Sequence, residues 1–182
     1  MAVAAVGLVL LAGCSRPVER PAPLPTPTAP AVSGTPSPSP LLPTPSPTVT
    51  EYSPAGATAF VEYYFAVLNF SIATGQTDEL STLSTPSCRT CRGYIEAIRM
   101  NWSAGRVEGG TVTLIGPQTP AFRPGDEVSV SGSYRVEASR TLAPDGRVLR
   151  EEPADRGGRV HVTLQRSAER WQVSAIRIGG QT

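Results

Sequence analysis

The chain contains no lysine: all sixteen of its basic residues are arginine, against fifteen acidic residues. The arginines are spread along the sequence and form no basic stripe, which a nucleic-acid-binding surface requires. Nucleic acid is therefore excluded as a partner. Because arginine is the only strong cation in the chain, its presence at any one position says little about function.

Histidine and cysteine are also scarce, with one histidine and three cysteines in 182 residues. His161 alternates with Val160 and Val162, so it is expected on the polar face of a strand, away from the core. A Ser–His–Asp or Cys–His catalytic group is therefore not expected. A zinc site usually takes four ligands, which one histidine and two neighbouring cysteines do not supply. We predict no catalytic residue, no metal site and no cofactor.

No apolar run is long enough to span a membrane. The N-terminal run, residues 1–13, falls short of the roughly 20 residues that a transmembrane helix needs and has the length of a signal-peptide core. It ends in Leu11-Ala12-Gly13-Cys14, which resembles the lipobox of bacterial lipoprotein precursors. The resemblance implies cleavage before Cys14, a diacylglycerol on its sulfur, and anchoring in the outer leaflet of the cytoplasmic membrane. The alternative is an ordinary Cys14 thiol in a secreted protein.

Residues 15–54 hold thirteen of the nineteen prolines and few apolar residues other than alanine and proline. Proline fixes φ and removes a backbone donor, so this composition predicts extended polyproline II stretches rather than a core. At about 3.1 Å per residue, the segment would reach on the order of 100 Å. We expect a disordered tether over residues 14–54 and a globular domain over residues 55–182.

Three helices are predicted at the start of the domain. Residues 57–74 repeat apolar side chains every three or four positions, over an arc wide enough to be covered on more than one side. Gly75 ends this helix. Thr77 opens a short second helix, and a third covers residues 88–104 with Trp102 on its inner face.

After the third helix the apolar period changes to two, which predicts four antiparallel strands. They are expected over residues 107–115, 127–142, 159–166 and 171–178, with a short return at 148–149 and a polar loop over 151–158. One bulge is expected at Gly109-Gly110, and another where the apolar phase changes between Val173 and Ile176. Helices first and strands after is an α+β pattern.

This order, with a long aromatic first helix and a closing strand from Trp171 to Ile178, resembles the NTF2-like cone. The resemblance implies three helices packed on a curved four-stranded antiparallel sheet, often around a pocket. Residues 57–65, then Thr74-Gly75, then Cys88-Arg89-Thr90-Cys91, also resemble an uncharacterised family of lipoproteins from high-GC Gram-positive bacteria. That family places a domain of unknown function behind a Pro-rich tether, and the resemblance implies no activity.

Cys88 and Cys91 lie one turn apart at the start of the third predicted helix. Helix geometry places their Cα atoms about 5 Å apart, within the range that a disulfide accepts. Thiols outside the cytoplasm tend to be oxidised. We predict a structural disulfide that stabilises the domain by about 2 kcal/mol. A thiol oxidoreductase is an alternative, since C-x-x-C at a helix start suits redox chemistry, but the thioredoxin pattern needs a βαβ context.

The candidates for lining a pocket are five aromatic residues: Tyr63, Tyr64, Trp102, Tyr134 and Trp171. Core packing with hydrogen-bonded polar tips is the simpler interpretation. Isomerases and cyclases of the cone fold use a carboxylate in the pocket, and the predicted inward strand positions hold none. We therefore predict a non-enzymatic lipoprotein domain that binds an envelope protein, another envelope component or a small apolar ligand, and leave a homodimer open. A pocket enzyme is the first alternative and a thiol oxidoreductase the second.

Overall fold

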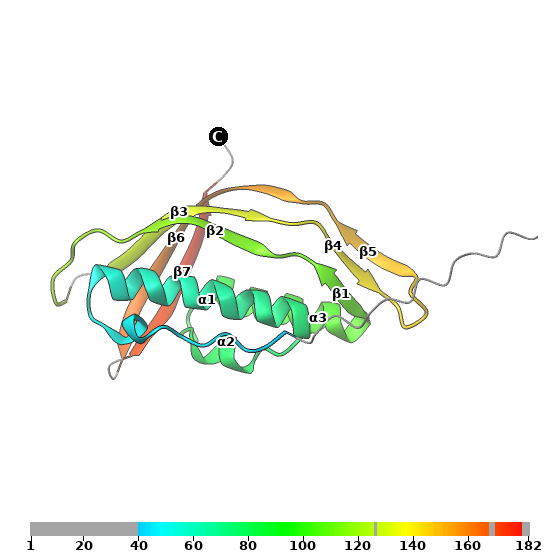
Figure 1. The fold of residues 1–182 in the computed structure, drawn as a ribbon, viewed down its shortest axis with the longest axis horizontal. Helices are drawn as coiled ribbons and strands as arrows, with labels where there is room; N and C mark the ends of the chain where they lie inside the picture. Colours follow the sequence, from blue (N-terminus) through cyan, green and yellow to red (C-terminus); the bar gives the residue numbers. More distant parts are fainter. Residues whose placement is uncertain (1–39, 126, 168–169, 180–182) are drawn as a thin grey trace, which may run out of the picture. The chain divides into compact units, whose positions relative to one another are not determined.

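Three helices lie beneath two antiparallel sheets in this computed structural model, which describes residues 40–125, 127–167 and 170–179 (Figure 1). The predicted α+β class is confirmed. The predicted signal segment, Cys14 and most of the predicted tether lie outside the described residues. Within the described part of the chain, none of the helices combines the length and apolarity needed to cross a membrane.

The helices follow the sequence signals closely. They are η1, a 3-10 turn (Pro47–Thr50), α1 (Pro54–Thr74), α2 (Asp78–Thr82) and α3 (Arg89–Ala104). Ser53 caps α1, since its hydroxyl accepts a hydrogen bond from the Gly56 amide at 3.0 Å. Gly75 ends α1 in the left-handed conformation, with φ of 77°.

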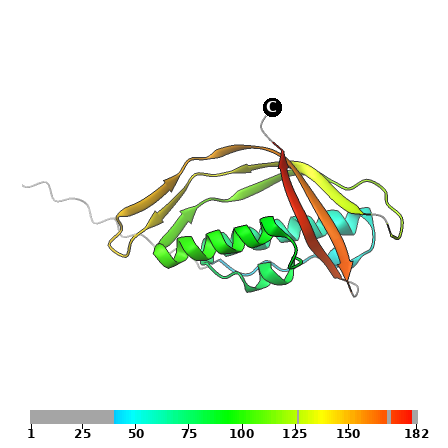
Figure 2. The ribbon, with the colours of Figure 1, turned by 180° about the vertical axis from the view of Figure 1, so that it is seen from behind.

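The larger sheet has four strands in the order β2-β3-β6-β7: β2 (Val112–Gln118), β3 (Val128–Val136), β6 (Asp155–Ser167) and β7 (Arg170–Gly179). Helix α1 packs beneath β2, and α3 packs beneath β7, as seen from behind in Figure 2. The expected phase change in the last strand is confirmed as a bulge. Thr163 pairs with Ala175 and Leu164 with Val173, so Ser174 is an extra residue.

A second, three-stranded sheet was not expected. It has the order β1-β4-β5 and contains β1 (Arg106–Gly109), β4 (Ser139–Leu142) and β5 (Val148–Glu152). Each of its strands adjoins a strand of the larger sheet along the chain, so the two sheets form one strongly bent surface (Figure 1). A bulge within one strand was predicted at Gly109-Gly110; instead the chain there passes from β1 to β2, and both glycines have positive φ, 75° and 81°. The single strand predicted over residues 127–142 is likewise divided, into β3 and β4.

The prediction of a polar loop over residues 151–158 was wrong, because this segment belongs to β5 and β6. All five residues of β5 are exposed. A strand with no buried face shows no apolar alternation, which is the signal by which strands are found in a sequence.

The core fills the space between α1, α3 and the larger sheet. Tyr64, Val61 and Val67 of α1 have no exposed surface, and Val130 and Val162 of the sheet have almost none. Both outer strands of this sheet are covered by the chain itself. At β7, a parallel bridge joins Ser84 to Val173. The amide of Thr85 donates to the Val173 carbonyl, and the Val173 amide donates to the Leu83 carbonyl, both at 2.9 Å.

The end of the predicted tether packs on the domain, so the folded unit begins before residue 55. Val49 packs against the core. The Trp171 indole N–H donates to the Glu51 carbonyl at 3.0 Å, and Tyr52 stacks on Trp171 with ring centroids 5.3 Å apart. Val49 and Tyr52 stand among prolines, serines and threonines and supply apolar surface that packs on the domain, whereas Leu41 and Leu42 earlier in the segment are exposed.

Candidate ligand-binding pocket

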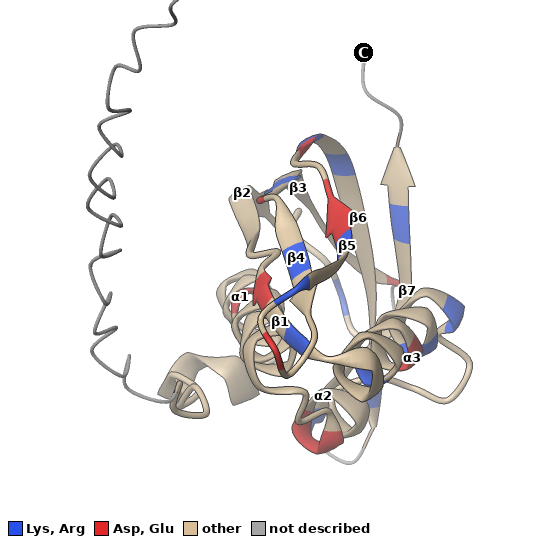
Figure 3. Ribbon diagram, turned by 90° about the vertical axis from the view of Figure 1, so that its right-hand side faces the viewer, with Lys and Arg blue, Asp and Glu red and all other residues tan. Residues whose placement is uncertain are grey.

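A cavity of about 360 Å³ lies between α1, α3 and the bent sheets. Figure 3 looks at the end of the domain where β1, β4 and β5 arch over the two helices. The walls of the cavity are mostly aliphatic and aromatic, with a few polar groups on the strands. The helix side is lined by Phe65, Leu68, Ile72, Tyr94, Ala97, Ile98, Asn101 and Trp102. The strand side is lined by Val107, Gly110, Val112, Tyr134, Val136, Ser139, Glu152, Asp155, Val160 and Ile178.

Trp102 is held in place by the end of α1. Its indole N–H donates to the Ile72 carbonyl at 2.9 Å. Gly75 lies directly against the ring, since a Cβ at that position would stand 2.8 Å from Trp102 Cγ. Glycine therefore serves two purposes at Gly75: it permits the positive φ and it leaves room for the indole.

The strand wall is fixed to α1 by Asn69. The Asn69 side chain donates to the Val112 carbonyl at 2.9 Å and accepts from the Val112 amide at 2.8 Å. These two bonds hold the start of β2 over the helix, beside Gly110 at the bend. A side-chain amide can pair with both backbone groups of one residue, as a neighbouring strand would.

The main polar contact in the pocket joins Tyr134 and Asp155. The Tyr134 hydroxyl donates to Asp155 Oδ2 at 3.4 Å, and the Gly157 amide donates to Asp155 Oδ1 at 2.8 Å. Burial raises the pKa of Tyr134, and the charge of Asp155 and the hydrogen bond to it raise that pKa further. Burial also raises the pKa of Tyr94, to which the proximity of Tyr134 adds. Both phenols thus stay protonated at neutral pH.

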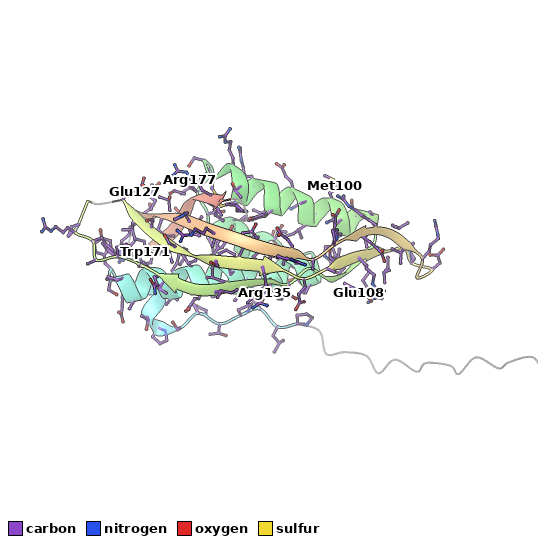
Figure 4. All side chains as sticks on the ribbon, turned by 90° about the horizontal axis from the view of Figure 1, so that it is seen from above. Met100, Glu108, Glu127, Arg135, Trp171 and Arg177 are labelled. Carbon is purple, nitrogen blue, oxygen red and sulfur yellow. A yellow bond between two sulfur atoms is a disulfide. The ribbon has the colours of Figure 1, made fainter. Side chains whose placement is uncertain are left out.

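Charge in the lining is of one sign. Among the described lining residues, Glu152 and Asp155 are acidic and none is arginine. Glu152 is exposed and its carboxylate pairs with Arg150, whereas Asp155 is partly buried. Two arginines of the larger sheet, Arg135 and Arg177, are exposed outside this lining, as Figure 4 shows from above.

Of the five aromatic residues predicted as pocket candidates, the structure places Trp102 and Tyr134 in the lining. Tyr64 lies in the core with no exposed surface. Tyr63 and Trp171 border a different hollow, beside Val49. There the Tyr63 hydroxyl donates to Glu79 Oε1 at 3.1 Å.

The expectation that no inward strand position carries an acid was wrong, because Asp155 lines the pocket. Val136 and Asp155 are directly paired across β3 and β6, and paired residues project to the same face of a sheet. The register shifts between this pair and the pair of Tyr134 with Gly158. That bulge changes the alternation, so counting back from Val160 does not place Asp155 inside. The nearest signal in the sequence was the run of glycines at Gly157-Gly158.

Cys88 and Cys91 form a disulfide at the start of α3, with an S–S distance of 2.04 Å and Cα atoms 5.3 Å apart. Neither residue has exposed surface, which fits a structural bridge better than a reactive thiol pair. His161 is exposed, as predicted, with Nδ1 2.8 Å from the Ser131 hydroxyl. Among the described residues, no three histidine, cysteine or acidic side chains come together as a metal site.

Comparison with known proteins identifies a family but no activity. The model of a family of unknown function, DUF6318, matches residues 29–177. No curated protein matches the chain. The model begins within the segment that we assigned to the tether.

Several solved structures share features of the fold at low identity. A protein from Catenulispora acidiphila is 14% identical, with 69% of this chain and 91% of that chain covered and a TM-score of 0.47. A protein with a cystatin-like fold from Caulobacter vibrioides is 11% identical, with 68% and 89% covered and a TM-score of 0.41. A protein named Rd1NTF2_05 is 11% identical, with 65% and 96% covered and a TM-score of 0.37. Likenesses this low give no information about what the pocket binds.

Proposed function

We propose that this chain, which belongs to the DUF6318 family of unknown function, binds a small and mostly apolar ligand in the pocket beneath the bent sheets. The observation that carries the proposal is a mostly apolar lining with a few polar groups, around a cavity of about 360 Å³. This volume falls within the range of about 300–1,000 Å³ that small-molecule sites occupy.

The lining supports binding over scaffolding. A surface whose only task is to pack would be filled by side chains at the density of a protein interior. Here Gly75 and the Ile72 carbonyl hold the ring of Trp102 in the wall of the cavity, so the ring does not occupy the cavity itself. A few polar groups among apolar walls are typical of sites that orient a ligand.

A titration of the full chain tests this proposal, with 4-phenyl-1-butanol as a neutral probe that has an apolar body and one polar end. We expect saturable chemical-shift changes in NMR spectra at residues that line the pocket. Val136→Phe fills the cavity and should weaken binding at least about tenfold, because the probe and the ring compete for the same volume. Val148→Phe is the matched control, since Val148 is exposed outside the pocket. No saturable binding, or equal binding to both variants, would overturn the proposal.

We place this binding domain outside the cytoplasm, on a lipid anchor at Cys14 and a Pro-rich tether. The lipobox-like motif before Cys14 supports the anchor. The disulfide between Cys88 and Cys91 supports an oxidising compartment. The membrane is then the first partner, and the ligand is a small molecule of the envelope or its surroundings.

Labelling cells with a palmitate analogue tests the location. The chain should incorporate the label and fractionate with membranes, and Cys14→Ser should lose the label and leave the membrane fraction. Recovery of an unlabelled, full-length chain from the cytosol would contradict this placement. The outcome of the probe titration does not depend on this labelling result, because Cys14 lies outside the described domain.

Asp155 in the lining favours a second candidate, a pocket enzyme that removes a proton from its substrate. Such an enzyme would use Asp155 as the base and Tyr134 as the donor to the developing oxyanion. The observed hydrogen bond runs against this division of roles, because the Tyr134 hydroxyl already donates to Asp155.

Exchange of α-protons in D₂O separates the two candidates, with 4-phenyl-2-butanone as the probe. Binding alone predicts the same exchange rate with the wild-type chain and with Asp155→Asn. Exchange that is accelerated by the wild-type chain and lost in Asp155→Asn would establish the enzyme.

A further inference from the structure

We infer that the ligand of this pocket carries a positively charged amine at its polar end and an aromatic or aliphatic body. The inference rests on the proposed function and adds the ligand class. Three features of the lining lead to it: the sign of the charges and the direction of the hydrogen bonds, which both depend on Asp155 because Glu152 already pairs with Arg150, and the nature of the walls.

The charges oppose an anionic ligand. Asp155 and Glu152 are the charged residues among the described lining, and both are acidic. The chain has sixteen arginines, so a shortage of cations does not explain why the described pocket lining contains none. A carboxylate or sulfonate in the pocket would meet repulsion from Asp155, and the described lining offers it no arginine. An ammonium would instead gain a charge-assisted hydrogen bond.

The hydrogen bonds at the polar group call for a donor on the ligand. Asp155 can only accept, and it already receives bonds from the Tyr134 hydroxyl and the Gly157 amide. Because the Tyr134 hydroxyl donates its hydrogen to Asp155, its oxygen presents lone pairs to the cavity. A ligand acceptor such as a carbonyl or carboxylate finds no partner in this pair. An ammonium offers three donors to the same two side chains.

The walls suit a cation at one end and an apolar body at the other. Trp102, Tyr94 and Tyr134 bring indole and phenol rings to the lining. Aromatic faces attract ammonium groups, and indole does so most strongly. Both phenols are kept protonated by burial. The aliphatic side chains Leu68, Ile98 and Val160 supply the floor on which the body of the ligand packs.

A matched set of three probes tests the inference on the full chain at pH 7. The probes 4-phenylbutylamine, 4-phenyl-1-butanol and 4-phenylbutyrate share one apolar body and differ in the charge of the polar end. We expect the amine to bind about tenfold more tightly than the alcohol, and the butyrate to bind more weakly than the alcohol. Isothermal titration calorimetry and NMR shifts measure the three affinities.

Variants show which side chain sets the preference. Asp155→Asn removes the charge and retains an oxygen for the Gly157 amide, so the amine and the alcohol should then bind equally. Glu127→Gln is the matched control, an exposed acid outside the pocket whose change should leave the tenfold preference intact. If Asp155→Asn does not fold, Tyr134→Phe serves in its place and should reduce the preference for the amine.

The outcomes distinguish this inference from the proposed function. Equal binding of amine and alcohol by the wild-type chain, or tightest binding of the butyrate, overturns the amine preference and leaves ligand binding intact. A preference that survives Asp155→Asn overturns the role of Asp155. If none of the three probes binds, the proposed function itself fails.

Discussion

The two ends of the domain differ in what lies beneath the sheet. At one end a segment that precedes α1 packs on Trp171 and leaves a hollow beside Val49, whereas the other end holds a mostly apolar pocket. We call them the filled end, around Trp171, and the hollow end, around Trp102. Helix α1 runs beneath the larger sheet from the filled end, whereas α3 lies toward the hollow end (Figures 1 and 2). Each end has a tryptophan whose indole N–H donates to a backbone carbonyl, at 3.0 Å for Trp171 and 2.9 Å for Trp102. The difference between the ends therefore does not arise from the tryptophans.

The filled end is closed by the segment that precedes α1. Tyr52 lies between Trp171, at 5.3 Å between ring centroids, and Phe122, at 5.1 Å. The Arg166 guanidinium lies over the rings of Tyr52 and Trp171, at 5.1 and 5.4 Å. It also donates to the Thr50 carbonyl at 3.3 Å. One stretch of chain thus fills the space below the sheet.

The hollow end has no equivalent among the described residues. There the sheet bends at Gly109-Gly110, and β1, β4 and β5 continue over the helices (Figure 3). Trp102 and Tyr134 form walls of the space. The bent strands thus cover a mostly apolar pocket at the hollow end. At the filled end the segment before α1 occupies part of the space and borders the hollow that remains.

Trp171→Ala should have the largest effect, because it opens the filled end. Trp171 is 3% exposed, and removal of such a side chain costs about 3–5 kcal/mol. Urea unfolding followed by circular dichroism measures the loss. Trp102→Ala should cost less, since Trp102 is only partly buried beside an existing cavity. Equal losses in the two variants would mean that the two ends do not differ in packing.

Reduction of the disulfide between Cys88 and Cys91 should lower the free energy of unfolding by about 2 kcal/mol. The bridge lies at the start of α3, where Thr90 of the same turn donates to the Ile176 carbonyl at 3.0 Å. Urea unfolding with and without a reductant measures the difference. Probe binding in the hollow end should not change before the domain unfolds, and a parallel loss of affinity would show that the two ends are coupled.

Ser53→Ala should cost about 1 kcal/mol, because it removes the N-cap of α1. The N-cap lies just after the segment that packs at the filled end, so removal of the cap should also weaken the packing of Tyr52. Thermal unfolding and Tyr52 fluorescence changes report both effects. Ser53→Asp restores a capping oxygen and should recover most of the stability, and failure to recover would point to another role for Ser53.

Tyr64→Phe should have the smallest effect at neutral pH, a gain of less than about 1 kcal/mol. Tyr64 lies in the shared core, and among the described residues its buried hydroxyl has no hydrogen-bond partner. The variant therefore removes an unpaired polar group and keeps the ring. Unfolding free energies at pH 7 measure the change, and a loss above about 1 kcal/mol would indicate a partner for the hydroxyl.

The same variant should alter the alkaline limit of stability. Burial raises the pKa of Tyr64 well above 10.0. Above pH 10 the unfolded chain gives up this proton while the folded chain keeps it, so the stability present below pH 10 is lost as pH rises. Urea titrations from pH 8 to 11 should show a shallower loss for Tyr64→Phe than for the wild type. Identical pH dependence of stability in the two proteins would contradict a raised pKa for Tyr64 in the folded state.

The sequence predicted those parts of the fold that local rules govern. Gly75 at the end of α1 and the disulfide follow from helix geometry. The bulge before Ile176 follows from the alternation of buried side chains. All three depend on neighbours within a few residues.

The parts that were missed depend on distant contacts. Asp155 enters the pocket because a bulge in β6 changes the register opposite Tyr134, which alternation does not reveal. The short return predicted at 148–149 matches the start of β5, but this strand has no buried face, so no apolar pattern marks the rest of it. Tyr52 packs on Trp171, a residue far along the chain, and its Pro-rich surroundings resemble a linker.

The two hydrogen bonds from Asn69 to Val112 also oppose aggregation of the protein through its outer strand β2. Outer strands of a sheet recruit strands from other molecules through free amides and carbonyls, which is a route to aggregation. At β2, Asn69 occupies the amide and the carbonyl of Val112. At β7, Leu83 and Thr85 occupy those of Val173. At these two positions an incoming strand finds both groups taken, which disfavours growth of the larger sheet from molecule to molecule there.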